Sequence, residues 1–216
     1  MAYIKNCLLT ITVLNLFLTH QVHGQIKTSH YLYAEFESAV VLFKSGVAEE
    51  VGLNYNTLTE EMVYRQQGTY FALDQTGTID TVFLHQKRFI PHEDFFLEVM
   101  RKEQATLLVR HRNKLINTGT STTFGSSQTN AIDNITNIIS TGKVYDLVIA
   151  GDYKLVPENG FYLMVDGQYH RITGTKDLNR QFPGRDKDIR DFIRANKIKI
   201  NQAEDLINLL VYLQTK

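Results

Sequence analysis

The chain has 216 residues, with 23 Lys and Arg against 23 Asp and Glu, one Cys, three Pro and no Trp. Hydrophobic residues make up 43% and charged residues 21%, values that are ordinary for a globular protein and exclude the disordered, collagen-like and coiled-coil classes. The length suits one compact domain, or one domain with a smaller appendage. A formal charge of zero removes the long-range attraction on which nucleic-acid binding depends, so we expect no nucleic-acid partner.

Residues 1–24 predict a secretory signal peptide. Lys5 supplies the positive charge, residues 7–18 are uncharged and mostly apolar, and a small residue precedes Gln25. A helix of that twelve-residue run spans about 18 Å, short of the roughly 30 Å hydrocarbon core of a bilayer, so we favour cleavage over a retained N-terminal anchor. The sequence therefore predicts an exported protein without a transmembrane segment after cleavage.

Cleavage before Gln25 also removes Cys7, the only cysteine of the chain. The loss of Lys5 from the 23 basic residues leaves 22 against 23 acidic ones. Without cysteine, the mature chain has no disulfide, thiol nucleophile or thiolate metal ligand. Such a protein must be stabilised by core burial alone, and it fits a bacterial envelope better than a eukaryotic secretory route. We expect no cofactor.

Between residues 25 and 117 the pattern predicts an antiparallel β meander, folded as a small barrel or a sandwich. Short runs rich in β-branched and aromatic residues recur every 8–12 residues and are separated by turns that often contain Gly. The predicted strands cover residues 39–44, 47–55, 61–66, 69–73, 78–84, 95–100 and 105–111.

The segment from residue 118 to 142 begins with an uncharged stretch of mostly Ser, Thr and Gly, which predicts a loop or linker. Residues 143–216 form a second region. A strand is expected over residues 144–150, and Asp166-Gly167 predicts a hairpin between strands over 161–165 and 168–172. Helices are expected to follow Thr175 and Asn201 as N-caps, with another beginning at Arg185. The predicted fold class is therefore α+β.

The histidines provide the only candidates for a metal site. The best constellation is His85, then His92 and Glu93 in the following turn, then His111 on a later strand. If the strands bring these residues together, Glu93 could act as a general base on a metal-bound water. No pair has the local spacing of a zinc site, however, and a polar turn with solvated histidines explains the pattern more simply. We assign no catalytic, cofactor-binding or metal-binding residue.

The predicted helical region carries an excess of positive charge. Eight basic and four acidic residues lie between Gly174 and Lys199. Such a surface could contact an acidic protein partner or anionic headgroups, although interleaved Asp residues are equally typical of a solvated helix face. The candidate interaction residues are Lys176, Arg180, Arg185, Lys187, Arg190 and Arg194.

One motif supports a wider comparison. The sequence LNYNTLTEEM at residues 53–62 resembles a segment of a family of exported, signal-peptide-bearing Bacteroidota proteins of unknown function. The resemblance extends to residues 88–91, 95–99, 107–109, 166–169, 180–183 and 204–207, and so covers nearly the whole mature chain. It implies export across the inner membrane of a Gram-negative cell, and so a location in the periplasm or on the periplasmic face of the outer membrane. It implies no activity and no catalytic residues.

The leading hypothesis is an exported envelope protein that is not an enzyme and acts through contacts with another protein or with the membrane surface. One alternative is a small-ligand-binding β domain lined by Phe83, Phe89 and Phe95. A second alternative is a metal-dependent hydrolase at the histidine constellation.

Overall fold

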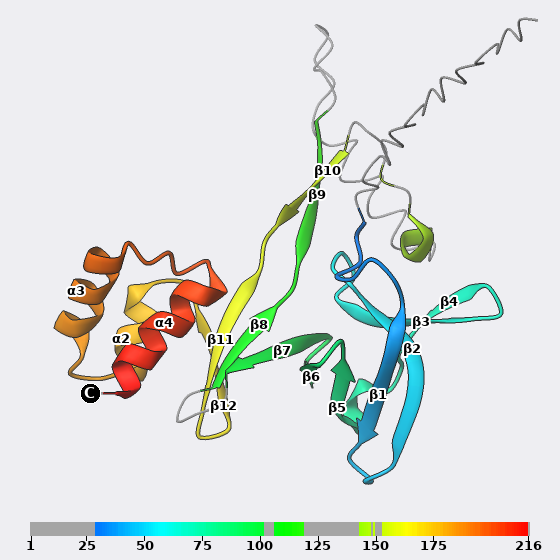
Figure 1. Ribbon diagram of the computed structural model, residues 1–216, viewed down its shortest axis with the longest axis horizontal. Helices are drawn as coiled ribbons and strands as arrows, with labels where there is room; N and C mark the ends of the chain where they lie inside the picture. Colours follow the sequence, from blue (N-terminus) through cyan, green and yellow to red (C-terminus); the bar gives the residue numbers. More distant parts are fainter. Residues whose placement is uncertain (1–28, 102–105, 119–142, 148, 150–152, 216) are drawn as a thin grey trace, which may run out of the picture.

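The computed structural model describes residues 29–101, 106–118, 143–147, 149 and 153–215 (Figure 1). Its strands are β1 (Glu37–Phe43), β2 (Ala48–Asn56), β3 (Glu61–Gln66), β4 (Thr69–Ala72), β5 (Ile79–Leu84), β6 (Lys87–His92), β7 (Phe95–Arg101), β8 (Thr106–Arg110), β9 (Asn113–Asn117), β10 (Tyr153–Pro157), β11 (Gly160–Val165) and β12 (Gln168–Ile172). Its helices are α2 (Thr175–Gln181), α3 (Asp186–Asn196) and α4 (Ala203–Gln214), with short 3₁₀ turns η1 (Thr76–Thr78) and η2 (Lys143–Asp146).

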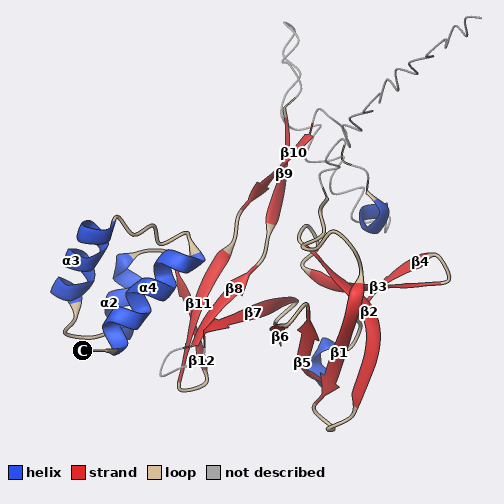
Figure 2. Cartoon of the chain, in the orientation of Figure 1, coloured by secondary structure: helices blue, strands red, loops and turns tan. Residues whose placement is uncertain are grey.

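Ten of the strands form one antiparallel sheet. Their order is β12-β11-β8-β7-β6-β5-β1-β2-β3-β4, and the sheet is not closed on itself, so the arrangement is sandwich-like. Two runs of hairpins meet where β5 returns to pair with β1. Helices α2, α3 and α4 gather at the β12 end (Figure 2). The predicted α+β class, with a β meander, a C-terminal hairpin and a helical packet, is confirmed.

Two-residue turns set the register of three hairpins. Gln67-Gly68, His85-Gln86 and Asp166-Gly167 join β3 to β4, β5 to β6 and β11 to β12, and both residues of each turn have positive φ. This is the type I′ conformation, whose twist matches that of the flanking strands. The Asp-Gly turn was readable from the sequence. The His-Gln turn was not, because neither residue is typical of that conformation.

Strands β8 and β11 continue beyond the sheet as the two-stranded ribbon β9–β10, which projects from the body in Figure 1. The sequence did not predict β9 or β10. The strand expected over residues 144–150 is also wrong where the structure describes it, because residues 143–146 form η2. The Tyr145 hydroxyl donates to Glu61, and the Tyr145 carbonyl accepts from the Tyr31 hydroxyl, both at 2.8 Å. These bonds fasten a turn, rather than a strand, beside β3. The predicted linker at residues 118–142 lies outside the described residues except for Thr118.

The helices begin one residue away from the expected N-caps. Gly174 is the N-cap of α2 and Gln202 that of α4, and neither has a capping side chain. Instead, a carboxylate in the first turn reaches back: Asp177 accepts from the Thr173 amide at 2.9 Å, and Asp205 accepts from the Lys199 amide at 2.7 Å. These bonds tie the segment that precedes each helix to the first helical turn, where a carboxylate also interacts favourably with the positive end of the helix dipole.

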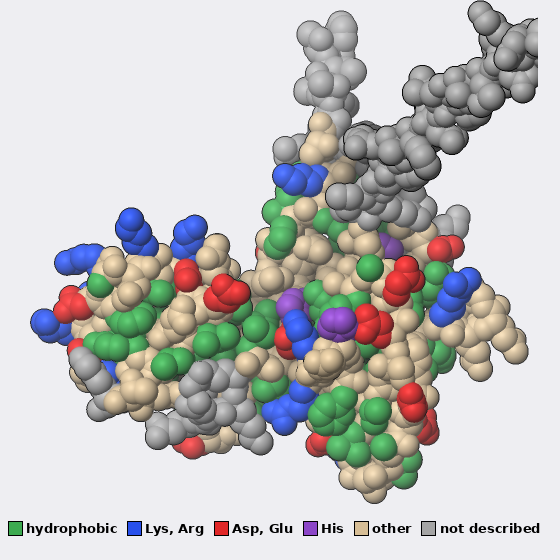
Figure 3. Space-filling model, viewed as in Figure 1, with side chains coloured by type: hydrophobic (Ala, Val, Ile, Leu, Met, Phe, Trp, Pro, Cys, Tyr) green, Lys and Arg blue, Asp and Glu red, His purple; other side chains and the backbone are tan. Residues whose placement is uncertain are grey.

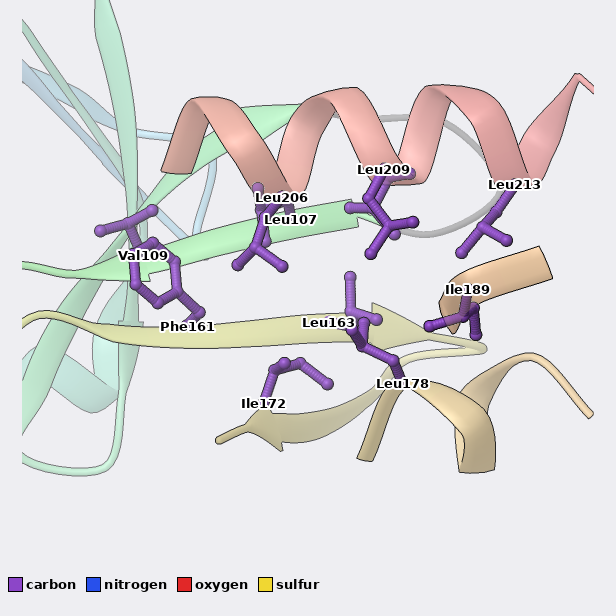
Figure 4. Close-up of a cluster of buried hydrophobic side chains, with 11 residues drawn as sticks. Leu107, Val109, Phe161, Leu163, Ile172, Leu178, Ile189, Leu206, Leu209 and Leu213 are labelled. Atoms are coloured by element: carbon purple, nitrogen blue, oxygen red, sulfur yellow. The ribbon is translucent and has the colours of Figure 1, made fainter. Parts of the chain in front are cut away.

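The buried side chains form separate clusters on the two faces and ends of the sheet. The helical-end cluster lies between α2–α4 and strands β8, β11 and β12 (Figure 4), and comprises Leu107, Val109, Phe161, Leu163, Ile172, Leu178, Ile189, Leu206, Leu209, Leu210 and Leu213. A second cluster lies among β1–β3 and β5–β7, and it includes Leu53, Tyr55, Met62, Val82 and Phe89. A third, smaller cluster contains Phe95, Leu97, Leu108 and Tyr162.

Candidate functional site

The outer face of α3 carries a row of exposed cations. Lys187, Arg190, Arg194 and Lys197 follow one another at spacings of three, four and three residues, and all are exposed. Residues three and four apart lie on the same side of an α-helix, so Lys187, Arg190 and Arg194 form one row on α3, and Lys197 follows as the residue that ends the helix. We call these four residues the cationic stripe. Lys and Arg side chains stand out along the rim of the helical end in Figure 3.

The opposite side of α3 fixes this row in place. Ile189 is fully buried in the helical-end cluster, and Phe192 and Ile193 pack against it. The Phe192 ring also stacks on the ring of Tyr212 from α4, with centroids 4.4 Å apart. The cations are therefore presented by a helix whose rotation is set by packing.

The stripe is only partly neutralised by neighbouring carboxylates. Lys187 donates to Asp191 at 2.9 Å, and this hydrogen bond lowers the pKa of Asp191. Arg190 and Arg194 make no ion pair within the described part of the chain. Both therefore keep their guanidinium donors available to an incoming acceptor.

The other predicted interaction residues differ in their surroundings. Arg185 is half-buried, donating to Asp188 at 2.7 Å and to the Leu213 carbonyl at 3.0 Å, so it holds α3 and α4 together. Arg180 lies 3.6 Å from Asp177 and is exposed, as is Lys176, and both belong to α2. The sequence could not separate Arg185 from the rest, because its role depends on a carbonyl 28 residues away.

A second polar region lies on the β6–β8 part of the sheet. Glu98 of β7 is only 2% exposed and accepts from His111 Nε2 at 2.6 Å and from Lys87 Nζ at 3.2 Å. Burial acts to raise the pKa of Glu98, but the bonds from His111 and Lys87 outweigh it, and the pKa is lowered. Glu98 is therefore a buried carboxylate that is held ionised.

A second His–Glu pair lies close to the first. His85 Nδ1 and Glu37 Oε2 are 2.6 Å apart, and the ring of Tyr33 lies 4.7 Å from that of His85. Burial raises the pKa of Tyr33, and the charges of Glu98 and Glu37 raise it further. The Tyr33 hydroxyl therefore interacts electrostatically with both carboxylates, and its raised pKa keeps it protonated. In Figure 3, His, Lys or Arg, and Asp or Glu side chains adjoin one another in the middle of the visible face.

The four metal candidates are divided between two places. His85 and His111 belong to the two His–Glu pairs, whereas His92 and Glu93 lie at the other end of β6. There, the His92 ring contacts that of Tyr169 at 4.3 Å, and Glu93 points to solvent. In the described part of the chain, no three His, Cys, Asp or Glu side chains are grouped so that they could hold a metal ion.

The proposed apolar lining of a ligand cavity is also dispersed. Phe83 is 44% exposed on the outside of the sheet, Phe89 is fully buried in the second cluster, and Phe95 belongs to the third. These three rings do not surround a common space.

The LNYN motif has a structural role. Asn54 donates to the carbonyls of Tyr33 and Glu35, at 2.8 and 2.9 Å, and accepts from the amides of Tyr33 and Tyr55. Asn56 accepts from the amides of Leu58 and Thr59 and so closes the β2–β3 turn. The motif therefore joins the segment before β1 to the centre of the sheet.

Two functional-looking groups were missed by the sequence analysis. Glu98 interrupts an apolar strand, FFLEVM, and a charge in such a run is a usable signal of a buried pair. Glu60 binds the Arg110 guanidinium through both carboxylate oxygens, and Arg110 lies 3.9 Å over the Phe95 ring. No local sequence pattern could predict the pair of Glu60 and Arg110, because the two residues are 50 positions apart.

The chain matches no protein-family model, no curated protein and no solved structure. None of the helices in the described part of the chain has the length and apolar character that a bilayer crossing requires.

Proposed function

We propose that the protein is an exported envelope protein that binds an acidic region of another protein through the cationic stripe, without catalysing a reaction. The observation that carries this proposal is the exposed row Lys187, Arg190 and Arg194, followed by Lys197 at the C-cap, on a helix whose opposite side is packed into the core. Because packing already fixes the helix, its backbone pays no ordering cost on binding, and Arg in particular can bind a carboxylate with two parallel hydrogen bonds. Export is supported by the signal-like residues 1–24.

The chemistry of the helical end favours an acidic protein over a membrane. A helix that binds a bilayer surface combines cations with exposed apolar side chains that enter the lipid. The large hydrophobic side chains that are exposed in the described residues are Val40, Val47, Phe71, Phe83, Ile116 and Tyr169, and none of them belongs to α2, α3 or α4. The cationic stripe therefore offers positive charge without a large exposed apolar side chain that could enter the lipid.

The test compares two triple charge reversals in the tagged full-length gene. The first variant is Lys187→Glu/Arg190→Glu/Arg194→Glu. The control is Lys114→Glu/Lys154→Glu/Arg171→Glu, which changes the net charge equally at exposed positions outside the helices. Proteins crosslinked to each form in the native envelope are identified by mass spectrometry, and the N-terminal peptide shows whether the product begins at Gln25.

We expect one acidic partner that is retained by the control and lost by the stripe variant. With the purified partner, the stripe variant should bind at least about tenfold more weakly, and wild-type binding should weaken between 50 and 200 mM salt, because exposed charges are screened. Equal partner loss in both variants would contradict the proposal. So would stripe-dependent sedimentation with phosphatidylglycerol vesicles in the absence of a protein partner.

A further inference from the structure

The two edges of the ten-stranded sheet differ in how they are protected. An uncovered edge strand offers unpaired N–H and C=O groups to another strand, and proteins usually block it with charges, Pro or a covering helix. At one edge, β12 carries His170 and Arg171 and is followed by α2, which packs beside it. At the other edge, β4 has the sequence TYFA, without charge or Pro. Figure 1 shows β4 projecting from the body of the sheet.

The register of the β3–β4 hairpin shows which groups face outward. Its type I′ turn, Gln67-Gly68, makes Gln66 and Thr69 a hydrogen-bonded pair, and such pairs alternate along an antiparallel ladder. Phe71 therefore bonds inward to Tyr64, and the bond from the Leu73 amide to the Met62 carbonyl continues the alternation. The N–H and C=O groups of Tyr70 and Ala72 point to the free edge.

Aromatic side chains lie on both sides of this edge. Phe71 is 41% exposed and stacks on Tyr64, with centroids 5.4 Å apart. Tyr70 contacts Phe36 at 5.7 Å, and the Arg65 guanidinium lies 5.6 Å from the Tyr70 ring. Tyr, Phe and Arg are the residue types enriched at the energetic centres of interfaces.

From these features we infer that β4 pairs antiparallel with β4 of a second copy of the chain. A two-fold axis at Phe71 uses all four outward groups, since Tyr70 then bonds to Ala72 of the partner subunit and Ala72 to the partner subunit's Tyr70. In these two pairs the large side chain of Tyr70 faces the small side chain of Ala72. Phe71 lies opposite the partner subunit's Phe71 in a non-hydrogen-bonded pair, where side chains are closest.

Charge and size define the strength of this contact. Because β4 is uncharged, two copies approach without like-charge repulsion along the paired strands. A four-residue strand and its flanking rings bury less than the roughly 1,200 Å² of a standard interface, so the dimer is weak and reversible. We expect a dissociation constant in the micromolar range.

The first test measures the oligomeric state by sedimentation equilibrium, up to about 1 mM chain. The exported product of the full gene should show a monomer–dimer equilibrium. Phe71→Lys should raise the dissociation constant at least about tenfold, because it places two ammonium groups at the axis. Phe83→Lys is the matched control, since Phe83 is similarly exposed but lies on a central strand, and it should leave the equilibrium unchanged.

A second variant removes one hydrogen bond without adding charge. Ala72→Pro deletes an N–H that faces the free edge, so the bonds to β3 remain, and Pro is tolerated at such positions. It should weaken the dimer while the monomer keeps its thermal unfolding midpoint. A loss of folding by Ala72→Pro would contradict the outward direction of that group.

Disulfide formation tests the register directly, using the gene with Cys7→Ser as background. In Phe71→Cys the two Cα atoms lie about 4.5 Å apart across the axis, within the range of a disulfide. In the control Thr69→Cys they lie roughly 14 Å apart, beyond that range. Oxidation should give a covalent dimer for position 71 only. Equal crosslinking at both positions, none at either, or a wild-type protein that is monomeric at all concentrations would overturn the inference.

Discussion

Residues 153–215, which supply the helices and the last strands, bury only hydrophobic side chains, whereas residues 54–98 also bury polar ones among the apolar. Within the described residues 153–215 no polar side chain is buried, while Asn54, Asn56, Glu60 and Glu98 are all buried between residues 54 and 98. Both ends belong to the same sheet. The comparison shows that one sheet can be stabilised by two different means along its width.

Apolar burial and buried polar bonding should respond differently to pH. Apolar burial depends on packing and is insensitive to pH, because it involves no titrating group. A buried carboxylate contributes only while it is ionised and its donors are present. Perturbing each end separately therefore tests the distinction.

The largest effect is expected at the helical end. Leu209 is fully buried in the helical-end cluster, so Leu209→Ala should lower the free energy of unfolding by about 3 kcal/mol, through lost apolar contact and the cavity left behind. Urea unfolding followed by circular dichroism measures this loss at pH 7 and pH 5. The two losses should agree. A cost that depends on pH would contradict a purely apolar origin.

A smaller, pH-dependent effect is expected for Glu98→Gln. The amide loses the charge-assisted bonds to His111 and Lys87, which should cost about 2 kcal/mol at pH 7. Because the folded-state pKa of Glu98 is lowered, its contribution is complete above the ordinary carboxylate pKa and is lost as the pH falls through the lowered value. The wild type and Glu98→Gln should therefore converge in stability as the pH falls through that lowered pKa, below the ordinary carboxylate range.

Asp191→Asn is the control for that experiment, since it removes an exposed carboxylate paired with Lys187. It should leave the urea midpoint unchanged at both pH values, because exposed ion pairs contribute little. A wild-type advantage over Glu98→Gln that persists undiminished into acid would show that packing, and not charge, explains the role of Glu98.

The smallest effect is expected for Asn54→Ala, and it should be confined to the backbone around Asn54. Asn54→Ala removes the bonds to the backbone of Tyr33 and Glu35 without opening the apolar clusters. Amide hydrogen exchange should accelerate at Tyr33 and Tyr55, whose N–H groups Asn54 accepts, and remain slow in α4. Faster exchange throughout the chain would mean that the two ends of the sheet do not behave independently.

Periodicity and turn chemistry were enough to predict most of the fold. Alternating β-branched runs, the Asp166-Gly167 turn and the spacing of Ile189, Phe192 and Ile193 are local signals, and the corresponding elements are present. Strands β9 and β10 were missed because NKLIN and YKLVP are short and mixed in polarity. Their pairing with each other, rather than their own propensity, makes them strands.

The candidate site was less accessible to sequence reasoning. Spacing along α3 is visible in the sequence, so the stripe residues Lys187, Arg190 and Arg194 could be named. The partners of Glu98 depend on strand order, and β6 was not predicted at all. Likewise, the sequence alone could not show that His85 and His92 lie far from each other. They are at opposite ends of β6, and the two ends have different neighbours.

The pairing of β11 with β8 has a consequence for how the chain acquires its structure. Gly160 pairs with Arg110, 50 residues earlier, whereas β2–β3, β3–β4, β5–β6 and β6–β7 are hairpins closed by short turns. Contacts between distant residues form slowly, because the intervening loop must be ordered first. During synthesis the β1–β8 part is thus complete while Leu107 and Val109 have nothing to cover them. Until the C-terminal residues arrive, that bare apolar surface exposes the nascent chain to aggregation.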